Sequence, residues 1–478
     1  MRALTISLFL IYSHSVFSND ISISQVEYVQ ADRPDYIRGI NFTISWKNSW
    51  NTNKNHDAAW VFFKALSDNG GHRHLYLKPN SARVSWKASP EMPDATAEIP
   101  TDGTGMMVYP IDNFRGDVTY RFFVALDTAR LSERYINYLN STTVEGYGIE
   151  MVYIPQGSFT LGDPDTTALN YGAFFESDNS GGFEGLYTIS KENEAIEVGT
   201  SEGNLYYLAS EPEYQGDQKG PIPATFPKGV DAFYLMKYEV NQGTYTAFLN
   251  SLTSEAASVR YTGGTPKYFK SGGTIRLEKE HFVADLPQQR MVFWHWDDMM
   301  AFTDWAGLRP YTELEYTKAC RGPGKPVARE MPWNTADDDK MIRRINSKTH
   351  QMELPEGFDE RLLDDKNREL YGASYYLVMD LAGSMWEKVI TVGDSIGRAF
   401  EGQHGDGRVD YYGMANVGGW PSGYGESYGY GYRGGGYYAK AHISEFNPYS
   451  PIAYRLYGAW SGGPRNAAYG YRAARTIE

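Results

Sequence analysis

The chain has 478 residues, 41% hydrophobic and 15% aromatic, which is enough for two or three domains with packed cores. Its 45 basic and 59 acidic residues give a formal net charge of -14. This charge excludes nucleic acid as an expected partner, because binding to phosphates needs a cationic face.

Residues 1–18 have the pattern of a secretory signal peptide. Arg2 supplies the positive charge, an apolar stretch runs from Ala3 to Ile11, and Val16-Phe17-Ser18 allows cleavage after the serine. The apolar stretch is too short to span a bilayer, and no other segment is typical of a membrane span. We therefore expect an exported protein whose mature chain has no transmembrane segment.

The chain has a single cysteine, Cys320, so an intrachain disulfide is impossible. Export without disulfides is more typical of bacteria than of the eukaryotic secretory route. The expected location is the bacterial periplasm, the cell surface or the medium.

Residues 19–145 are expected to form an all-β domain. Hydrophobic and polar residues alternate over 40–46, the two-residue period of a half-buried strand. Further strand candidates lie at 59–63 and 118–124, and turn-rich stretches such as 67–71 separate them. This spacing predicts an immunoglobulin-like or fibronectin-like β-sandwich.

The remainder, 146–478, has mixed signals. Helices are predicted at 241–249, with an Asn cap, and at 296–305, with acidic residues in the first turn. Thr312-Glu313-Leu314-Glu315 is a capping box that opens a third helix through Cys320. Residues 163–230 form a Gly-rich stretch whose aromatic residues suggest that it packs.

Several short motifs follow one another in the second region. In chain order they are Met151-Val152-Tyr153-Ile154-Pro155-Gln156-Gly157-Ser158-Phe159, Phe233-Tyr234-Leu235-Met236-Lys237-Tyr238-Glu239-Val240, Leu308-Arg309-Pro310-Tyr311-Thr312-Glu313-Leu314-Glu315-Tyr316, Asp380-Leu381-Ala382-Gly383-Ser384-Met385-Trp386-Glu387, Arg433-Gly434-Gly435-Gly436 and Tyr469-Gly470-Tyr471-Arg472. This series resembles the formylglycine-generating enzyme (sulfatase-modifying factor) family, whose fold is a variant of the C-type lectin fold. The resemblance implies an α+β protein in which the sandwich of 19–145 precedes a family domain over 146–478, with 163–230 as an insertion.

The enzymes of that family bind copper and oxidise a substrate cysteine with two cysteines that follow the glycine-rich strand. Here Ala439 and Ser444 stand at the matching positions, and Cys320 is far upstream. Copper(I) and thiol oxidation both need thiolates, so neither copper nor formylglycine generation is expected.

Iron-dependent, sulfoxide-forming relatives use several histidines. This chain has nine His in all. His72 and His74 could face the same way on a strand, although a solvated loop is the simpler interpretation, and His442 near the former reaction centre is a lone histidine. A metal site needs three or more convergent ligands.

The resemblance also implies a calcium loop. Carboxylates from Asp380 and Glu387 and backbone carbonyls from Gly383 and Met385 would supply hard oxygen ligands. Lys388 replaces an aromatic residue of the family pattern and places a cation nearby. Two interpretations remain open, a calcium site and a tight turn without an ion.

The segment from 410 to 438 is exceptionally rich in tyrosine and glycine, a composition typical of binding surfaces. The predicted ligand-binding residues are Tyr411, Tyr412, Trp420, Tyr424, Tyr428, Tyr430, Tyr432, Tyr437 and Tyr438. The alternative is that these rings pack in the core, as aromatic residues of this strand do in the family.

Three functions remain open on this basis. The first is a non-catalytic binding protein, or pseudoenzyme, whose partner is an unknown protein or glycan. The second is an oxidoreductase related to formylglycine-generating or iron-dependent sulfoxide-forming enzymes, and the third is a structural subunit of a cell-surface assembly.

Overall fold

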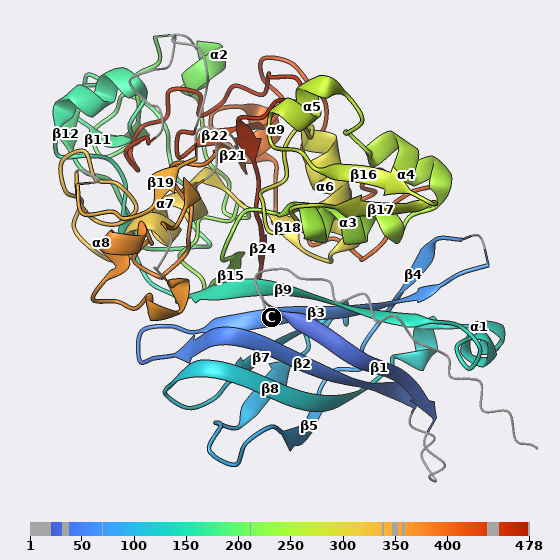
Figure 1. Ribbon diagram of the computed structural model, residues 1–478. Helices are drawn as coiled ribbons and strands as arrows, with labels where there is room; N and C mark the ends of the chain where they lie inside the picture. The colour runs from blue at the N-terminus through green and yellow to red at the C-terminus, as the bar shows by residue number, and fades with distance from the viewer. Residues whose placement is uncertain are drawn as a thin grey trace, which may run out of the picture.

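The computed structural model describes residues 21–30, 38–68, 70–210, 212–336, 339–346, 352–355, 359–436 and 449–476. The fold is mostly sheet with some helices, and a β-rich half lies beneath a half of helices and short strands (Figure 1). In these ranges no helix has both the length and the apolar character needed to cross a bilayer.

The first half consists of two stacked antiparallel sheets. One sheet has the order β1 (Ser22–Gln30), β2 (Arg38–Asn51), β8 (Phe114–Ala125) and β5 (Arg83–Lys87). The other contains β6 (Ala95–Glu98), β7 (Met106–Pro110), β3 (Asp57–Leu66) and β4 (His72–Leu75). Strands β2, β3 and β8 confirm the three strands predicted at 40–46, 59–63 and 118–124.

A shared core holds the two sheets together. Phe42 of β2 stacks on Phe122 of β8 with ring centroids 5.6 Å apart, and meets Phe63 of β3 edge-on at 5.1 Å. All three rings are buried. The hydrophobic residues that alternate along these strands therefore lie on one face of each sheet. The two hydrophobic faces pack against each other, which removes their apolar area from water.

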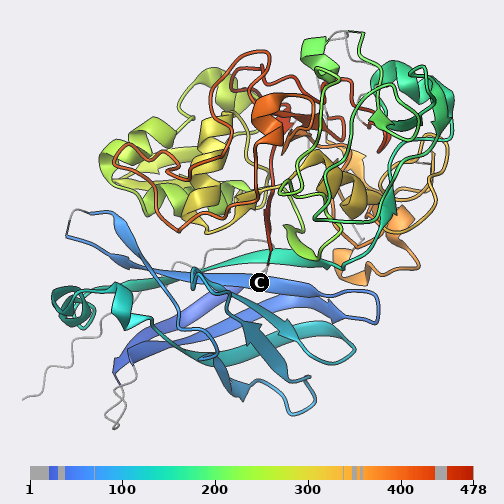
Figure 2. The ribbon, with the colours of Figure 1, turned by 180° about the vertical axis from the view of Figure 1, so that it is seen from behind.

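The second sheet continues from the first half into the second half. Strand β9 (Val144–Ile154) pairs with β3 along one edge and with β15 (Phe233–Met236) along the other, and the order then runs to β24 (Ala473–Arg475) and β18 (Arg309–Pro310). Val152 is opposite Asp57 on one side and Leu235 on the other. The sheet thus crosses the expected boundary between residues 145 and 146, and both views show β9 lying between the two halves (Figures 1 and 2).

Five small sheets complete the strands. They comprise β10 (Phe159–Thr160) with β13 (Thr188–Ile189), β12 (Phe183–Gly185) with β11 (Phe175–Ser177) and β14 (Leu205–Tyr206), β16 (Ile275–Glu278) with β17 (His281–Ala284), β19 (Arg344–Ile345) with β20 (Met352–Glu353), and β22 (Tyr430–Arg433) with β21 (Trp386–Ile390) and β23 (Tyr469–Gly470). The first two of these sheets fold the segment 163–230 onto the molecule, where Phe174, Phe175 and Tyr207 are buried. The prediction that this segment packs is confirmed.

The helices are short. They are α1 (Glu133–Tyr138), α2 (Pro212–Gln215), α3 (Gln242–Asn250), α4 (Ser254–Arg260), α5 (Pro266–Lys270), α6 (Trp296–Trp305), α7 (Glu313–Arg321), α8 (Arg368–Tyr371) and α9 (Ser395–Arg398), with short 3-10 helices at Thr128–Arg130, Thr166–Tyr171 and Glu360–Leu362. The Asn241 side chain accepts from the Thr244 N–H at the start of α3, and Thr312 and Glu315 form the predicted capping box of α7. All three helices predicted in the second half are therefore confirmed.

Candidate functional site

The glycine-rich strand β22, with the glycines that follow it, is part of the core. The guanidinium of Arg433 is buried and donates to Thr317 Oγ1 at 3.1 Å and to the Ile452 carbonyl at 3.0 Å. Gly434 has φ +87°, and a Cβ there would lie 2.5 Å from the Leu381 carbonyl oxygen. Close backbone packing accounts for this glycine.

The segment that follows this strand carries several predicted positions. Ala439 and Ser444, together with Tyr437, Tyr438 and His442, lie outside the described residues. The one thiol of the chain lies on α7, where Cys320 is buried. Burial raises the pKa of the Cys320 thiol far above its usual value, so this sulfur is not a thiolate at neutral pH.

The predicted calcium loop lies between the glycine-rich strand and a cluster of arginines. Asp380 accepts hydrogen bonds from Arg290, with Nη2 at 2.5 Å from Oδ2, and from Nη1 of Arg343. Burial alone would raise the pKa of Asp380, but Arg343 and Arg290 hold it well below its usual range. The carboxylate is therefore ionised and already has two cationic partners.

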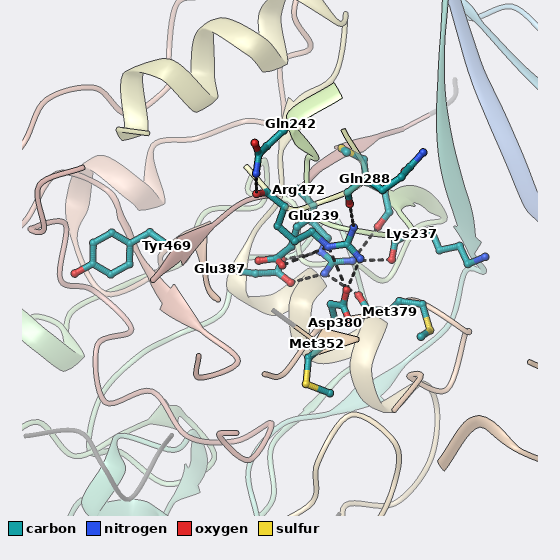
Figure 3. A network of polar contacts seen from close by, with 12 residues as sticks. Lys237, Glu239, Gln242, Gln288, Met352, Met379, Asp380, Glu387, Tyr469 and Arg472 are labelled. Atoms are coloured by element: carbon teal, nitrogen blue, oxygen red, sulfur yellow. Dashed lines mark hydrogen bonds and ion pairs between the residues drawn. The ribbon is translucent and has the colours of Figure 1, made fainter. Parts of the chain in front are cut away.

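The second predicted carboxylate ligand is paired in the same way. Glu387 on β21 accepts from Arg472, whose Nε lies 2.7 Å from Oε2, and from the Tyr311 hydroxyl at 2.5 Å. Figure 3 shows Arg472 reaching the Glu387 carboxylate in the centre of this network. Gly383 and Met385 lie between the two acids, and Gly383 has φ +86°.

The residues present do not fit calcium. A calcium ion needs several hard oxygen ligands, and here both carboxylates are neutralised by guanidinium groups that take the place of a cation. In the described ranges, no group of three or more His, Cys, Asp or Glu side chains is arranged to hold a metal ion. Asp380, Gly383 and Ser384 all have positive φ, and the chain bends through this loop.

Sequence reasoning missed a third carboxyl group of this network. Glu239 is buried directly after β15, and neither of its side-chain oxygens has a hydrogen-bond partner. Burial, followed by the nearby Glu387, raises the pKa of Glu239 well above its usual value. Its Oε2 lies 3.9 Å from Nε of Arg290. The cluster thus joins β15, β21 and the C-terminal strands.

Four of the predicted binding residues are exposed, as two pairs. The exposed fractions are 68% for Tyr411, 64% for Tyr412, 50% for Tyr424 and 36% for Tyr428. Tyr411 and Tyr412 meet edge-on with ring centroids 5.2 Å apart, and Tyr424 lies 5.1 Å from the ring of His295. We call these four residues the tyrosine surface.

Three others are part of the core, which corrects the expectation that they belong to an exposed surface. Tyr430 stacks on Trp296 at 4.2 Å and donates its hydroxyl hydrogen bond to the Gly423 carbonyl. Tyr432 donates to the Gly462 carbonyl at 2.6 Å, and the Trp420 indole donates to the Gln403 carbonyl at 2.9 Å. All three rings are buried, and Tyr430 and Tyr432 lie on strand β22 inside the domain.

Lys388 is a buried lysine within a cage of aromatic rings. Its Nζ has no hydrogen-bond partner and lies 5.3 to 5.5 Å from the ring centroids of Tyr430, Tyr432 and Tyr469. Burial lowers the pKa of Lys388 to about 7. The ring faces partly offset the loss of hydration when the ammonium is charged.

The two N-terminal histidines lie on a strand rather than in a solvated loop, which corrects the simpler interpretation. On β4, His74 is buried and its Nε2 is 2.8 Å from the Thr104 carbonyl oxygen. Nε2 of His72 lies 3.5 Å from Glu145. Burial lowers the pKa of His74 well below its usual value, and the nearby Lys64 lowers it further.

Comparison with known proteins gives a family match for the second half. The model of the sulfatase-modifying factor enzyme 1-like domain matches residues 184–477. No curated protein matches the chain. Among solved structures, the group B streptococcus pilus 2b backbone protein is 12% identical over 46% of this chain and 83% of that chain, with a TM-score of 0.13. A TM-score of this size supports no inference about fold or function.

Proposed function

Because this chain belongs to the family with a sulfatase-modifying factor enzyme 1-like domain, we propose that it is an exported bacterial protein that binds a ligand without catalysis. The observation that carries this proposal is the tyrosine surface, in which Tyr411, Tyr412, Tyr424 and Tyr428 are exposed while their aromatic neighbours in the same segment are buried. The ligand is a protein or a glycan.

Tyrosine suits this role physically. Its ring offers a large, stiff contact area with few torsions to fix on binding, and its hydroxyl can donate or accept a hydrogen bond. Tyr411 and Tyr412 are anchored by a turn, because Asp410 Oδ1 accepts from the backbone N–H groups of Tyr412 and Met414. The rings are therefore presented on an ordered backbone, which reduces the entropy cost of binding.

The lack of suitable cysteines supports the part of the proposal that excludes catalysis. Copper-dependent oxidation of a substrate cysteine needs reactive thiolates, and the single cysteine of this chain is buried on α7. The finer assignment of the first half, an immunoglobulin-like sandwich, is also part of the proposal and is supported by its two stacked antiparallel sheets.

The binding test uses the full mature chain as bait against envelope proteins and on a glycan array. We expect the double variants Tyr411→Ala/Tyr412→Ala and Tyr424→Ala/Tyr428→Ala to lose binding with little change in Tm. Trp86→Ala is the matched control, because Trp86 is 52% exposed on β5, outside the tyrosine surface. Undiminished binding by both double variants would contradict the proposal.

Two further measurements test the other parts of the proposal. Turnover of a cysteine-containing peptide with copper(I) above the blank would show that the protein is an enzyme. Cell fractionation with N-terminal sequencing tests export, and the expected mature chain begins at Asn19. A chain that stays in the cytoplasm with its first 18 residues would contradict export.

A further inference from the structure

Met414 lies in the loop that carries the exposed pair Tyr411 and Tyr412. In the part of the chain that the structure describes, Met92, Met331 and Met414 are partly exposed and the other methionines are buried. Met92 and Met331 pack against hydrophobic cores. Met414 belongs to a surface turn instead, where a soluble oxidant has access to the side chain.

The backbone of Met414 closes the turn that presents the two tyrosines. Its N–H donates to Asp410 Oδ1 at 2.8 Å, and its carbonyl accepts from the Asp410 N–H at 2.9 Å. Val409 and Ala415 form an isolated bridge just outside this pair. The two tyrosines therefore lie between residues whose backbones are tied together, so a displacement of Met414 changes the position of both rings.

The side chain of Met414 links this turn to helix α4. Nη2 of Arg260 donates to the Met414 sulfur at 2.9 Å, and Nη1 of the same guanidinium donates to Asp298 Oδ1 at 2.9 Å. Arg260 is only 5% exposed, and the ion pair with Asp298 fixes its position. Gly413 also lies against α4, because an added Cβ would be 3.1 Å from the Cβ of Ala256. The thioether is thus a contact between the turn and an immobile cation.

Oxidation of the sulfur would break this contact. When a thioether reacts with hydrogen peroxide, a sulfur lone pair attacks one peroxide oxygen and the O–O bond breaks. The attached oxygen passes its proton to the departing hydroxide, so the sulfur is oxidised to a sulfoxide and the peroxide is reduced to water. The new oxygen has no space between the Met414 sulfur and Nη2 of Arg260, and the sulfoxide is much more polar than the thioether. Since Asp298 holds the arginine, the turn is the part that moves.

We propose that Met414 is an oxidation site, and that its sulfoxide releases the turn over 409–415 from α4 and so disorders the presentation of Tyr411 and Tyr412. The oxidant is a peroxide, and the change is reversible because sulfoxides can be reduced enzymatically to the thioether. This inference rests on the proposed binding function, since it makes one pair of the tyrosine surface sensitive to oxidation. Tyr424 and Tyr428 lie outside the turn.

The experiment treats the full mature chain with hydrogen peroxide and follows it by peptide mass mapping and hydrogen exchange. We expect Met414 to gain one oxygen before Met92 and Met331 do. Exchange protection should then be lost at the N–H groups of Tyr412 and Met414, both of which donate to Asp410. The matched control is Met414→Leu, which keeps the side-chain volume but has no sulfur. Peroxide should leave the exchange of its turn unchanged.

Three outcomes would overturn the inference. The first is oxidation of Met92 or Met331 ahead of Met414, and the second is a Met414 sulfoxide in a turn that stays protected. The third is loss of protection in the peroxide-treated Met414→Leu variant, which would assign the effect to another residue.

The inference and the proposed function fail in different ways. A captured partner whose binding depends on the tyrosine double variants but is unaffected by oxidation of Met414 would overturn the switch and retain the binding function. A turn released by peroxide in a chain whose double variants bind as well as the wild type would support the oxidation site and contradict the tyrosine surface.

Discussion

Arg472 and Glu387 form an ion pair in the interior, with Nε 2.7 Å from Oε2 and neither side chain exposed. The same guanidinium donates to the backbone carbonyls of Met236, Lys237 and Met379. One arginine therefore satisfies acceptors from β15, from the loop before β21 and from β21 itself. A buried charge of this kind is tolerated only when all its donors have partners.

Removing one member of this pair should destabilise the fold strongly. We expect Arg472→Met to lower the free energy of unfolding by about 3 to 5 kcal/mol, because it leaves the buried Glu387 carboxylate without its cation. Urea denaturation monitored by tryptophan fluorescence measures this change. Lys191→Met is the control, because the ion pair between Lys191 and Glu194 is well exposed and such pairs contribute at most about 1 kcal/mol. Equal losses in the two variants would contradict the assigned role.

The tyrosine-rich segment should divide into two classes on mutation. Tyr430→Ala should cost about 3 to 5 kcal/mol, because it removes a buried ring stacked on Trp296 and leaves a cavity. Tyr424→Ala should change stability by less than about 1 kcal/mol, because that ring is half exposed. Thermal melts of the two variants separate these classes, and similar Tm values would show that Tyr430 is not part of the core.

Lys388 should make stability depend on pH in the alkaline range. Burial lowers its pKa to about 7 in the folded protein, whereas an unfolded lysine titrates near about 10.4. Between these two pH values the lysine carries its proton in the unfolded chain but not in the folded protein. The free energy of unfolding therefore rises with pH in this interval, and Lys388 causes no change with pH below 7.

The measurement compares the wild type with Lys388→Met by urea denaturation at neutral pH and near pH 9. The wild type should gain up to about 3 kcal/mol relative to the variant over this interval, and the variant should be the more stable protein at neutral pH. Lys191→Met, at an exposed lysine, should follow the wild type. A pH dependence that survives Lys388→Met would assign it to another group.

Calcium should not stabilise the wild-type protein. The carboxylates of Asp380 and Glu387 are held by Arg290, Arg343 and Arg472, so a calcium ion would have to displace guanidinium groups that are themselves buried. Melting curves with added calcium and with a chelator are expected to coincide. A rise in Tm that grows with calcium concentration, as binding to the folded state requires, would contradict this prediction and restore the calcium loop.

The elements that could be predicted from sequence are those with local signals. Asn241 and the pair Thr312 and Glu315 identified two helix starts because capping depends on residues three apart. The alternation of hydrophobic and polar residues over 40–46 identified β2, because this signal also depends only on residues close together in the sequence. The family resemblance rested on short motifs in order, and the match over 184–477 confirms it.

The rest depended on contacts between distant residues. The motif Asp380 to Glu387 contains both acids of a calcium loop, but the arginines that neutralise them come from positions 290, 343 and 472. Composition could not show that Tyr430 is buried and Tyr428 exposed. Tyr430 lies on β22, and the position of that strand inside the fold depends on contacts with distant residues.

Strand β9 has a consequence for how this protein can be divided. Its two edges are occupied by β3 and β15, so cutting the gene on either side of it would strip a hydrogen-bonding neighbour from one fragment. Bare strand edges invite pairing between chains and aggregation. We therefore expect the two halves to stay together in evolution, because a gene that encodes only one of them would give a protein with an exposed strand edge.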